Sequence, residues 1–318
     1  MAHPYRLSLA TLALILLQGC SQRNLGRTLR ENAPAPPAAP RILAVYEPWF
    51  GHPQHIDVGY SSQDSVVIRK QIEQAKNLGI SGFVVDWYGD REPFLDRAYA
   101  LIGSIAAEQN FTVAMMYDET EKGGEQATED ALVAFAKFRE QYLAPGTPGR
   151  EAYLMYQGRP VIFIFPKGGH TDWNRVRKET SKWTPPPLLL YEYGPGSLAA
   201  FDGFYAWVNP GNKGWTADGS NWGEDYLRDF YRTMQTKYSD KIAVGAAWPG
   251  FDDKKASWSL GRYMSQRCGR TLADTMRLSR DYYAADRPLP FLLIATWNDY
   301  EEGTAIERGL AKCGAPSP

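Results

Sequence analysis

A chain of 318 residues with 22% charged residues is long enough for one large core or two ordinary domains. Its formal net charge of -1 gives no support for nucleic acid or an anionic membrane surface as the main partner. Aromatic residues make up 13% of the chain, including 10 Trp and 19 Tyr. Such rings fill cores, but their flat faces also stack on sugar rings, so the composition is compatible with a carbohydrate-binding protein.

The first 20 residues have the features of an export signal rather than of folded structure. Arg6 precedes an apolar run at residues 7–17 that is too short for a permanent membrane-spanning helix. The segment ending at Cys20 resembles a bacterial lipobox, whose cysteine carries lipid; a plain secretory signal with an incidental cysteine is the alternative. We therefore expect a lipoprotein signal peptide over residues 1–20 and lipidation of Cys20. The protein would lie in the bacterial cell envelope, touching the membrane only through this anchor, and Ser21 favours the outer membrane.

Residues 21–40 are polar and then rich in Ala and Pro, which predicts a semi-extended linker. The folded domain is then expected over residues 41–318. Only two cysteines, Cys268 and Cys313, remain in it. In an oxidising compartment they could form a disulfide, although two free buried thiols fit the sequence equally well.

From residue 41 onward, short apolar runs recur, and each ends in aromatic, acidic or proline residues. Amphipathic stretches between most of them predict helices, such as residues 64–78, which end before a glycine. Eight alternating units of this kind predict an α/β fold, a (β/α)8 TIM barrel with a single catalytic domain. A doubly wound sheet is the alternative, but no Gly-rich phosphate motif follows the first strand. The eight runs lie at residues 42–49, 82–89, 112–119, 160–166, 188–194, 203–210, 242–249 and 291–303.

In such a barrel, the carboxyl ends of all the strands meet on one face. Carboxylates and amides there can hydrogen bond to sugar hydroxyls, and indoles can stack on sugar rings, so we interpret this face as a carbohydrate-binding cleft. Each residue also has a structural alternative: a loop cap for Asp86, an ion pair for Glu47 and Glu192, and the core for the tryptophans. The candidate substrate-binding residues are Tyr46, Trp49, Asp86, Trp87, Tyr117, Asp118, Glu119, Glu192, Trp207, Asn209, Trp248, Trp297 and Asn298.

The last run ends in two carboxylic residues, Asp299 and Glu302. Hydrolysis of a glycosidic bond needs two carboxyl groups in different protonation states, and crowding of carboxylates in a dry cleft raises the pKa of one of them. We therefore predict Asp299 and Glu302 as the catalytic pair; a solvated acidic turn is the alternative. The chain has no Gly-x-Ser-x-Gly motif, and its histidines lack metal-site spacing, so we expect neither a metal nor a cofactor. His52 or His55 could still line the cleft.

Three segments resemble glycoside hydrolase family 99, the endo-α-mannosidases and endo-α-mannanases, and the related family 71, the α-1,3-glucanases. The segments are ILAVYEPWFG at residues 42–51, GISGFVVDWYG at 79–89 and WNDYEEGTAIE at 297–307. YLMYQGRPVIF at 153–163 also looks like the start of the fourth strand of the family 99 barrel. The resemblance implies a (β/α)8 barrel that acts on an α-linked glycan without metal. It also implies that Tyr46, Asp86 and Trp87 lie at the sugar site.

In family 99 the last motif holds two glutamates, and the second is the general acid/base, a role that carries to Glu302. The first deprotonates the 2-hydroxyl of the substrate, and the matching residue here is Asp299, one methylene shorter. Residues 297–300 are closer to family 71, whose motif has an Asp and a Glu at the same spacing and whose enzymes invert the anomeric configuration. Residues 303–307 are closer to family 99. We therefore expect an endo-acting α-glycosidase of α-mannan or α-1,3-glucan. The alternatives are a non-catalytic glycan-binding lipoprotein and a protein of surface-polysaccharide assembly.

Overall fold

The computed structural model describes residues 39–310, except residues 169, 195–198 and 285–286. The predicted signal peptide, Cys20, the linker up to residue 38 and Cys313 lie outside the described residues, so the predicted lipidation and disulfide stay predictions. No helix in the described part of the chain is both long and apolar enough to cross a membrane.

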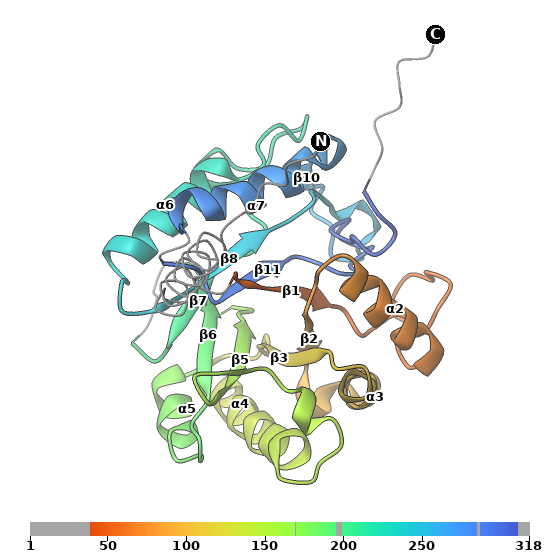
Figure 1. The fold of residues 1–318 in the computed structure, drawn as a ribbon, viewed down its shortest axis with the longest axis vertical. Helices are drawn as coiled ribbons and strands as arrows, with labels where there is room; N and C mark the ends of the chain where they lie inside the picture. The colour runs from red at the N-terminus through yellow and green to blue at the C-terminus, as the bar shows by residue number, and fades with distance from the viewer. Residues whose placement is uncertain (1–38, 169, 195–198, 285–286, 311–318) are drawn as a thin grey trace, which may run out of the picture. The chain divides into compact units, whose positions relative to one another are not determined.

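Parallel strands close into a barrel at the centre of the fold (Figure 1). The last strand pairs with both β8 and β1, where Leu293 lies beside Leu43, and this pairing closes the ring. The (β/α)8 prediction is therefore confirmed. The barrel strands are β1 (Arg41–Tyr46), β2 (Gly82–Trp87), β3 (Thr112–Asp118), β5 (Arg159–Phe165), β6 (Leu188–Glu192), β7 (Gly203–Tyr205), β8 (Ile242–Ala247) and β11 (Phe291–Ile294).

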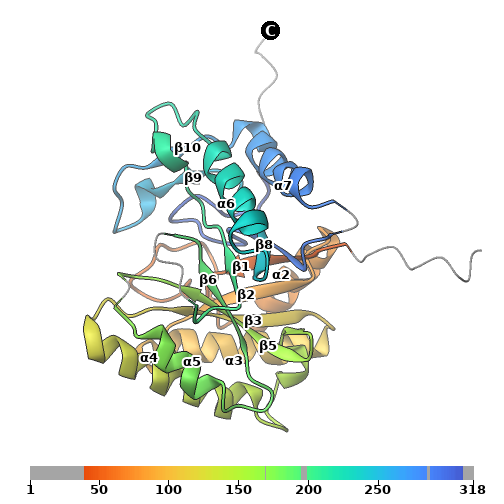
Figure 2. The same ribbon diagram turned by 90° about the vertical axis from the view of Figure 1, so that its left-hand side faces the viewer.

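Helices surround the barrel, with α6 and α7 side by side on one side and α3, α4 and α5 on the opposite side (Figures 1 and 2). Local sequence sets where they begin: the Asp64 side chain accepts the N–H of Val66 at the start of α2, and Pro93 occupies the first turn of α3. Among the described residues, no α-helix follows β11. The helices are α2 (Ser65–Asn77), α3 (Pro93–Glu108), α4 (Gly124–Phe138), α5 (Trp173–Thr180), α6 (Glu224–Thr236) and α7 (Arg270–Tyr282).

Two short additions decorate the barrel. Strand β4 (Met155–Tyr156) forms an antiparallel hairpin with β5, and β9 (Phe251–Asp252) pairs with β10 (Tyr263–Met264) in the connection between β8 and α7. The second hairpin brings residues 253–262 over the carboxyl ends of the strands, beside the residues that follow β11.

Side chains alternate along each strand between the barrel interior and the helices. The interior cluster contains Leu43 and Val45 of β1, Val84 of β2 and Met116 of β3, and it includes no helical residue. The outward residues between them pack on the helices in a separate and larger cluster. As a consequence, two neighbouring residues at the end of one strand point in opposite directions, and only one of them can face a central cavity.

Candidate active site

A cavity of about 500 Å³ lies at the carboxyl ends of the strands. Acidic and aromatic side chains dominate its lining, and they come from the ends of β1, β2, β3, β5 and β7 and from the segments that follow β8 and β11. Six of the predicted site residues line it, namely Trp49, Asp86, Asp118, Trp207, Asp299 and Glu302. His52 and His55 line it as well.

Three predicted residues, Tyr46, Trp87 and Tyr117, point away from the cavity, which corrects the expectation that they line it. Each is fully buried against the helices. The Tyr46 hydroxyl donates to Gln71 Oε1 of α2 at 2.8 Å, and the Trp87 indole N–H donates to Asp96 Oδ1 of α3 at 3.0 Å. The reason is strand alternation: their neighbours Glu47, Asp86 and Asp118 take the inward positions.

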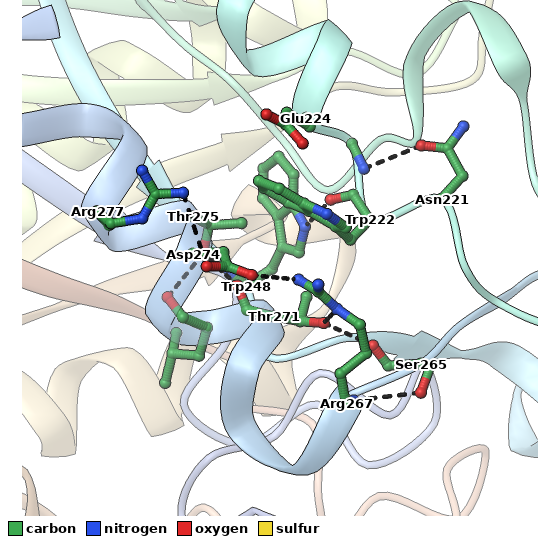
Figure 3. A network of polar contacts seen from close by, with 12 residues as sticks. Asn221, Trp222, Glu224, Trp248, Ser265, Arg267, Thr271, Asp274, Thr275 and Arg277 are labelled. Carbon is green, nitrogen blue, oxygen red and sulfur yellow. Dashed lines mark hydrogen bonds and ion pairs between the residues drawn. The ribbon is translucent and has the colours of Figure 1, made fainter. Parts of the chain in front are cut away.

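Trp248 and Trp297 are core residues, so their assignment to the cleft is also corrected. Trp248 lies between β8 and the two helices α6 and α7, where its indole N–H donates to the carbonyl of Trp222 at 3.0 Å (Figure 3). Arg267 covers Trp222 from outside, 5.0 Å from the centre of an indole ring, and pairs with Asp274 at 2.8 Å. Trp297 is fully buried beside Phe83, with ring centroids 5.4 Å apart.

Glu119, Glu192 and Asn209 do not line the cavity either. Glu119 is fully buried, and its carboxylate accepts the N–H of Lys167, which ties β3 to the segment after β5. Asn209 is exposed, and its side chain accepts the N–H of Gly211 within its own loop. Glu192 is partly buried at the end of β6, and burial raises the pKa of its carboxyl to about 7.

Asn298 acts on the cavity indirectly. It is fully buried, and its amide clasps the main chain of Glu47: Oδ1 accepts the Glu47 N–H at 2.7 Å, and Nδ2 donates to the Glu47 carbonyl at 2.9 Å. These two hydrogen bonds join residues that are 251 positions apart in the sequence, and they fix the end of β1 to the loop after β11. Asn298 therefore positions the Glu47 side chain in the cavity.

The two predicted catalytic carboxyls occupy different depths. Asp299 is 3% exposed, and its Oδ1 accepts the N–H groups of Glu301 at 2.9 Å and Glu302 at 2.8 Å. The side chain of Glu302 is 17% exposed, and its Oε1 accepts the indole N–H of Trp258 at 3.0 Å, with the guanidinium of Arg262 at 3.6 Å. The main chain thus fixes Asp299, whereas loop side chains orient Glu302.

Burial dominates the electrostatics of this pair. It raises the pKa of Asp299 well above its usual range, and the neighbouring charge of Glu302 raises it further. Burial also raises the pKa of Glu302, while the N–H of Trp258 and the charge of Arg262 oppose the rise. Because the charge of Glu302 raises the pKa of Asp299, the two carboxyls titrate together. Such a pair can supply an acid and a base at the same pH.

A second acidic group lies in the same cavity. Burial raises the pKa of Glu47 well above its usual range, followed by the charges of Asp86 and Asp299. Burial likewise raises the pKa of Asp86, followed by the charge of Asp118. Asp118 has a pKa of about 6, raised by burial and held down by Lys167, whose Nζ lies 3.0 Å from Asp118 Oδ2.

Aromatic side chains form a wall next to Glu302. The rings of Trp49 and His55 stack with centroids 4.8 Å apart and an interplanar angle of 5°. Trp258 meets Trp49 edge-on at 6.3 Å, and His55 Nδ1 is held 2.8 Å from Glu301 Oε2. Trp258 is 41% exposed beside Glu302, and its ring is therefore suited to stacking on the apolar face of a sugar ring.

Sequence reasoning missed Lys167, Trp258 and Arg262 as lining residues. Trp258 and Arg262 come from the connection between β8 and α7, which has no strand-end pattern to attract attention. The Asp253 carboxylate folds this segment by accepting four hydrogen bonds, from the Ser259 hydroxyl, the main-chain N–H groups of Leu260 and Arg262, and the Arg262 side chain. The length of the connection, together with its aromatic and basic residues, was the signal that could have found them.

Metal chemistry has no evident ligand set in the described part of the chain. No group of three or more His, Cys, Asp or Glu side chains there has the arrangement needed to hold a metal ion.

The fold and the cavity define a class: a (β/α)8 barrel with acidic and aromatic residues at the carboxyl ends of its strands. Solved structures with this fold include the GH99 endo-alpha-mannosidase from Bacteroides thetaiotaomicron, at 18% identity and a TM-score of 0.65 over 84% of this chain and 87% of that one. The same enzyme in complex with BIS-TRIS-propane gives 18% identity and a TM-score of 0.64 over 86% and 89%. A glycoside hydrolase-like protein gives 12% identity and a TM-score of 0.58 over 87% and 90%.

These likenesses show the fold, and it is the fold expected from the resemblance to family 99. No family model matches the sequence. No curated protein matches it either.

Proposed function

We propose that this protein is a glycoside hydrolase that cleaves within α-linked glycans, with Glu302 as the general acid and Asp299 as the base. The observation that carries the proposal is the pair itself: two neighbouring carboxyls with raised pKa values in one cavity, Asp299 fixed by two main-chain N–H groups and Glu302 held by Trp258. The shared fold with a GH99 endo-alpha-mannosidase supports it.

In the proposed reaction, Glu302 donates its proton to the glycosidic oxygen as the bond from that oxygen to the anomeric carbon breaks. Asp299 accepts a proton from the oxygen nucleophile that forms the new bond to the anomeric carbon. One proton leaves Glu302 and one arrives at Asp299, so exchange with solvent restores the pair after product release. Asp299 can serve either of two nucleophiles, a water molecule or the 2-hydroxyl of the substrate.

We favour water as the nucleophile. Asp299 is one methylene shorter than the glutamate of family 99, and because its Oδ1 is held by two N–H groups, the carboxylate cannot swing forward to make up the difference. The added space between Asp299 and the substrate fits a bridging water, as in inverting enzymes, whose carboxyls are about 6.5–9.5 Å apart. The product of this route has inverted anomeric configuration.

The substrates proposed are α-mannan and α-1,3-glucan, the glycans implied by the resemblance. A screen of both with the purified protein tests the proposal: new reducing ends that disappear in Glu302→Gln support it, and no product from any α-linked glycan refutes it. A non-catalytic glycan-binding protein is the second candidate, because Asp299 departs from the family 99 motif. Binding measured by calorimetry without any product would favour that candidate.

We further propose that the chain is exported and anchored in the bacterial envelope through lipid on Cys20, and that Cys268 and Cys313 form a disulfide. The lipobox-like segment and the linker support the first proposal, and an oxidising compartment supports the second. Metabolic labelling with a fatty acid tests the anchor, since Cys20→Ser should abolish the label. Mass spectrometry of peptides released without reduction tests the disulfide.

A further inference from the structure

Two carboxyls in the cavity, Glu47 and Asp86, remain without a role in bond cleavage. They are 4% and 5% exposed, and both line the cavity. One oxygen of each, Glu47 Oε2 and Asp86 Oδ1, is buried and has no hydrogen-bond partner. Buried carboxylate oxygens are normally paired, because leaving one unpaired forfeits its hydration without compensation. The pair therefore lacks a donor that a ligand could supply.

Nearby cations compensate this pair only in part, since the charges of Lys167 and Arg91 lower the pKa of Asp86 without forming an ion pair with it. Two cationic side chains line the cavity, and both are engaged: Lys167 with Asp118 at 3.0 Å, and Arg262 with Asp253 at 2.8 Å. None of the ion pairs within the described part of the chain includes Glu47 or Asp86. The acidic residues that line the cavity are Glu47, Asp86, Glu92, Asp118, Glu121, Asp299 and Glu302.

A cationic ligand would supply both the hydrogen-bond donors that these oxygens lack and a charge opposite to that of the acidic lining. The described side chains include no group arranged to bind a metal ion. A sugar hydroxyl could donate one hydrogen bond but would leave the negative charge of the pair uncompensated. An ammonium group carries a positive charge and three donors, so it can bond to more than one carboxylate at once.

We propose that Glu47 and Asp86 form a subsite for the protonated amino group of an amino sugar, so that the substrate class is an α-linked glycan with free, non-acetylated amino groups. This inference rests on the proposed function and narrows its substrate. Glu47 and Asp86 line the same cavity as Asp299 and Glu302, so the amino sugar lies close to the cleaved bond. The same acidic lining disfavours anionic glycans.

Electrostatics agrees with this geometry. Burial raises the pKa values of Glu47 and Asp86, and the charge of Asp86 raises that of Glu47 further, so both carboxyls hold their protons to higher pH than exposed ones. An ammonium bound between them favours the ionised carboxylates and expels those protons. Binding of the amine should therefore release protons, which calorimetry detects as a dependence of the heat on the buffer.

The test is calorimetry on Glu302→Gln, which is expected to bind without turnover. Three oligosaccharides of equal length are compared: an α-linked hexosamine with free amines, its N-acetylated form and a neutral α-mannan fragment. The free amine should bind at least about tenfold more tightly than the other two. Adding Asp86→Asn should bring its affinity to that of the neutral sugar, while adding Asp240→Asn, an exposed carboxyl before β8, should change nothing.

Equal affinities for the three sugars, or a preference that survives Asp86→Asn in a protein with unchanged circular dichroism, would overturn the inference. If Asp86→Asn does not fold, Glu47→Gln takes its place, with the same expected loss of preference. The wild-type protein separates this inference from the proposed function. Cleavage of neutral α-glycans without an amine preference refutes the subsite alone, whereas tight amine binding without cleavage refutes the hydrolase alone.

Discussion

Substitution of Asp253 by Asn should loosen the loop that holds Glu302. Asp253 is fully buried beneath residues 253–262, and its two oxygens accept four hydrogen bonds. This loop carries Trp258 and Arg262, the two side chains that contact the Glu302 carboxylate. Asp253 itself is not among the residues that line the cavity, so any effect on activity must act through the loop.

The expected loss of stability in Asp253→Asn follows from the hydrogen bonds that an asparagine side chain cannot accept. In the wild type, Asp253 Oδ2 accepts the Leu260 N–H at 3.0 Å and the Arg262 Nε–H at 2.8 Å. If the asparagine oxygen takes the place of Oδ1, its NH2 group takes the place of Oδ2 and faces these two donors. Two donors lose their partner, at about 1–3 kcal/mol each and more for the charged one. We expect the free energy of unfolding to fall by about 3–5 kcal/mol if the loop is part of the cooperative unit, and by less if it opens separately.

Hydrogen exchange by mass spectrometry distinguishes these two cases, because faster exchange confined to residues 253–262 marks local opening. Activity should fall through kcat rather than KM, since Glu302 loses its orientation while the rest of the cavity is kept. Asp240→Asn serves as the control for loss of one carboxylate and should leave both readouts unchanged. Wild-type exchange and turnover in Asp253→Asn would show that this buried carboxylate does not organise the site.

Further substitutions test single contacts. In Glu192→Gln, the carboxyl whose pKa rises from 4.5 to about 7 on folding is removed. Between pH 4.5 and about 7 the folded state binds more protons than the unfolded state, so the free energy of unfolding of the wild type falls as the pH rises through this range. The variant lacks this group and should be about 2–3 kcal/mol more stable than the wild type at pH 8. Urea unfolding that shows the same pH dependence in both proteins would contradict this prediction. Asn298→Ala removes the clasp on the Glu47 main chain and should cost about 2–4 kcal/mol of unfolding free energy, with a loss of less than about 1 kcal/mol arguing against a positioning role. Trp258→Phe removes an N–H that favours ionised Glu302, so the alkaline limb of the pH–rate profile should move to higher pH; an unmoved limb would exclude Glu302 as the group that titrates there.

The barrel was predictable because each strand reads as a short apolar run with a turn or helix signal after it. Such runs are local features, and the closure of eight of them into a ring follows from general rules of βα topology. The acidic ends of the strands were equally visible, and Asp86, Asp118, Asp299 and Glu302 do meet in one cavity.

The choice between neighbours at a strand end was where sequence reasoning went wrong. The strand-end pattern predicts Tyr46 at the sugar site and leaves an ion pair as the alternative for Glu47, but the structure turns Tyr46 toward Gln71 and Glu47 into the cavity. Leu43 and Val45 of β1 face the barrel interior, and alternation along the strand makes Glu47 the next residue on that side. Trp258 could not be found in this way, because it reaches Glu302 from a loop whose path depends on the buried carboxylate of Asp253.

The central claim is that Glu302 and Asp299 together cleave an α-glycosidic bond. It is tested most directly by following the digestion of an α-linked oligosaccharide by proton NMR with the wild-type protein, Glu302→Gln and Asp299→Asn. The account predicts that the β-anomer appears first with the wild type, and that each variant keeps its fold and loses turnover by at least about a hundredfold. Turnover close to that of the wild type in either variant would contradict the assignment of this pair, and a first-formed α-anomer would contradict water as the nucleophile.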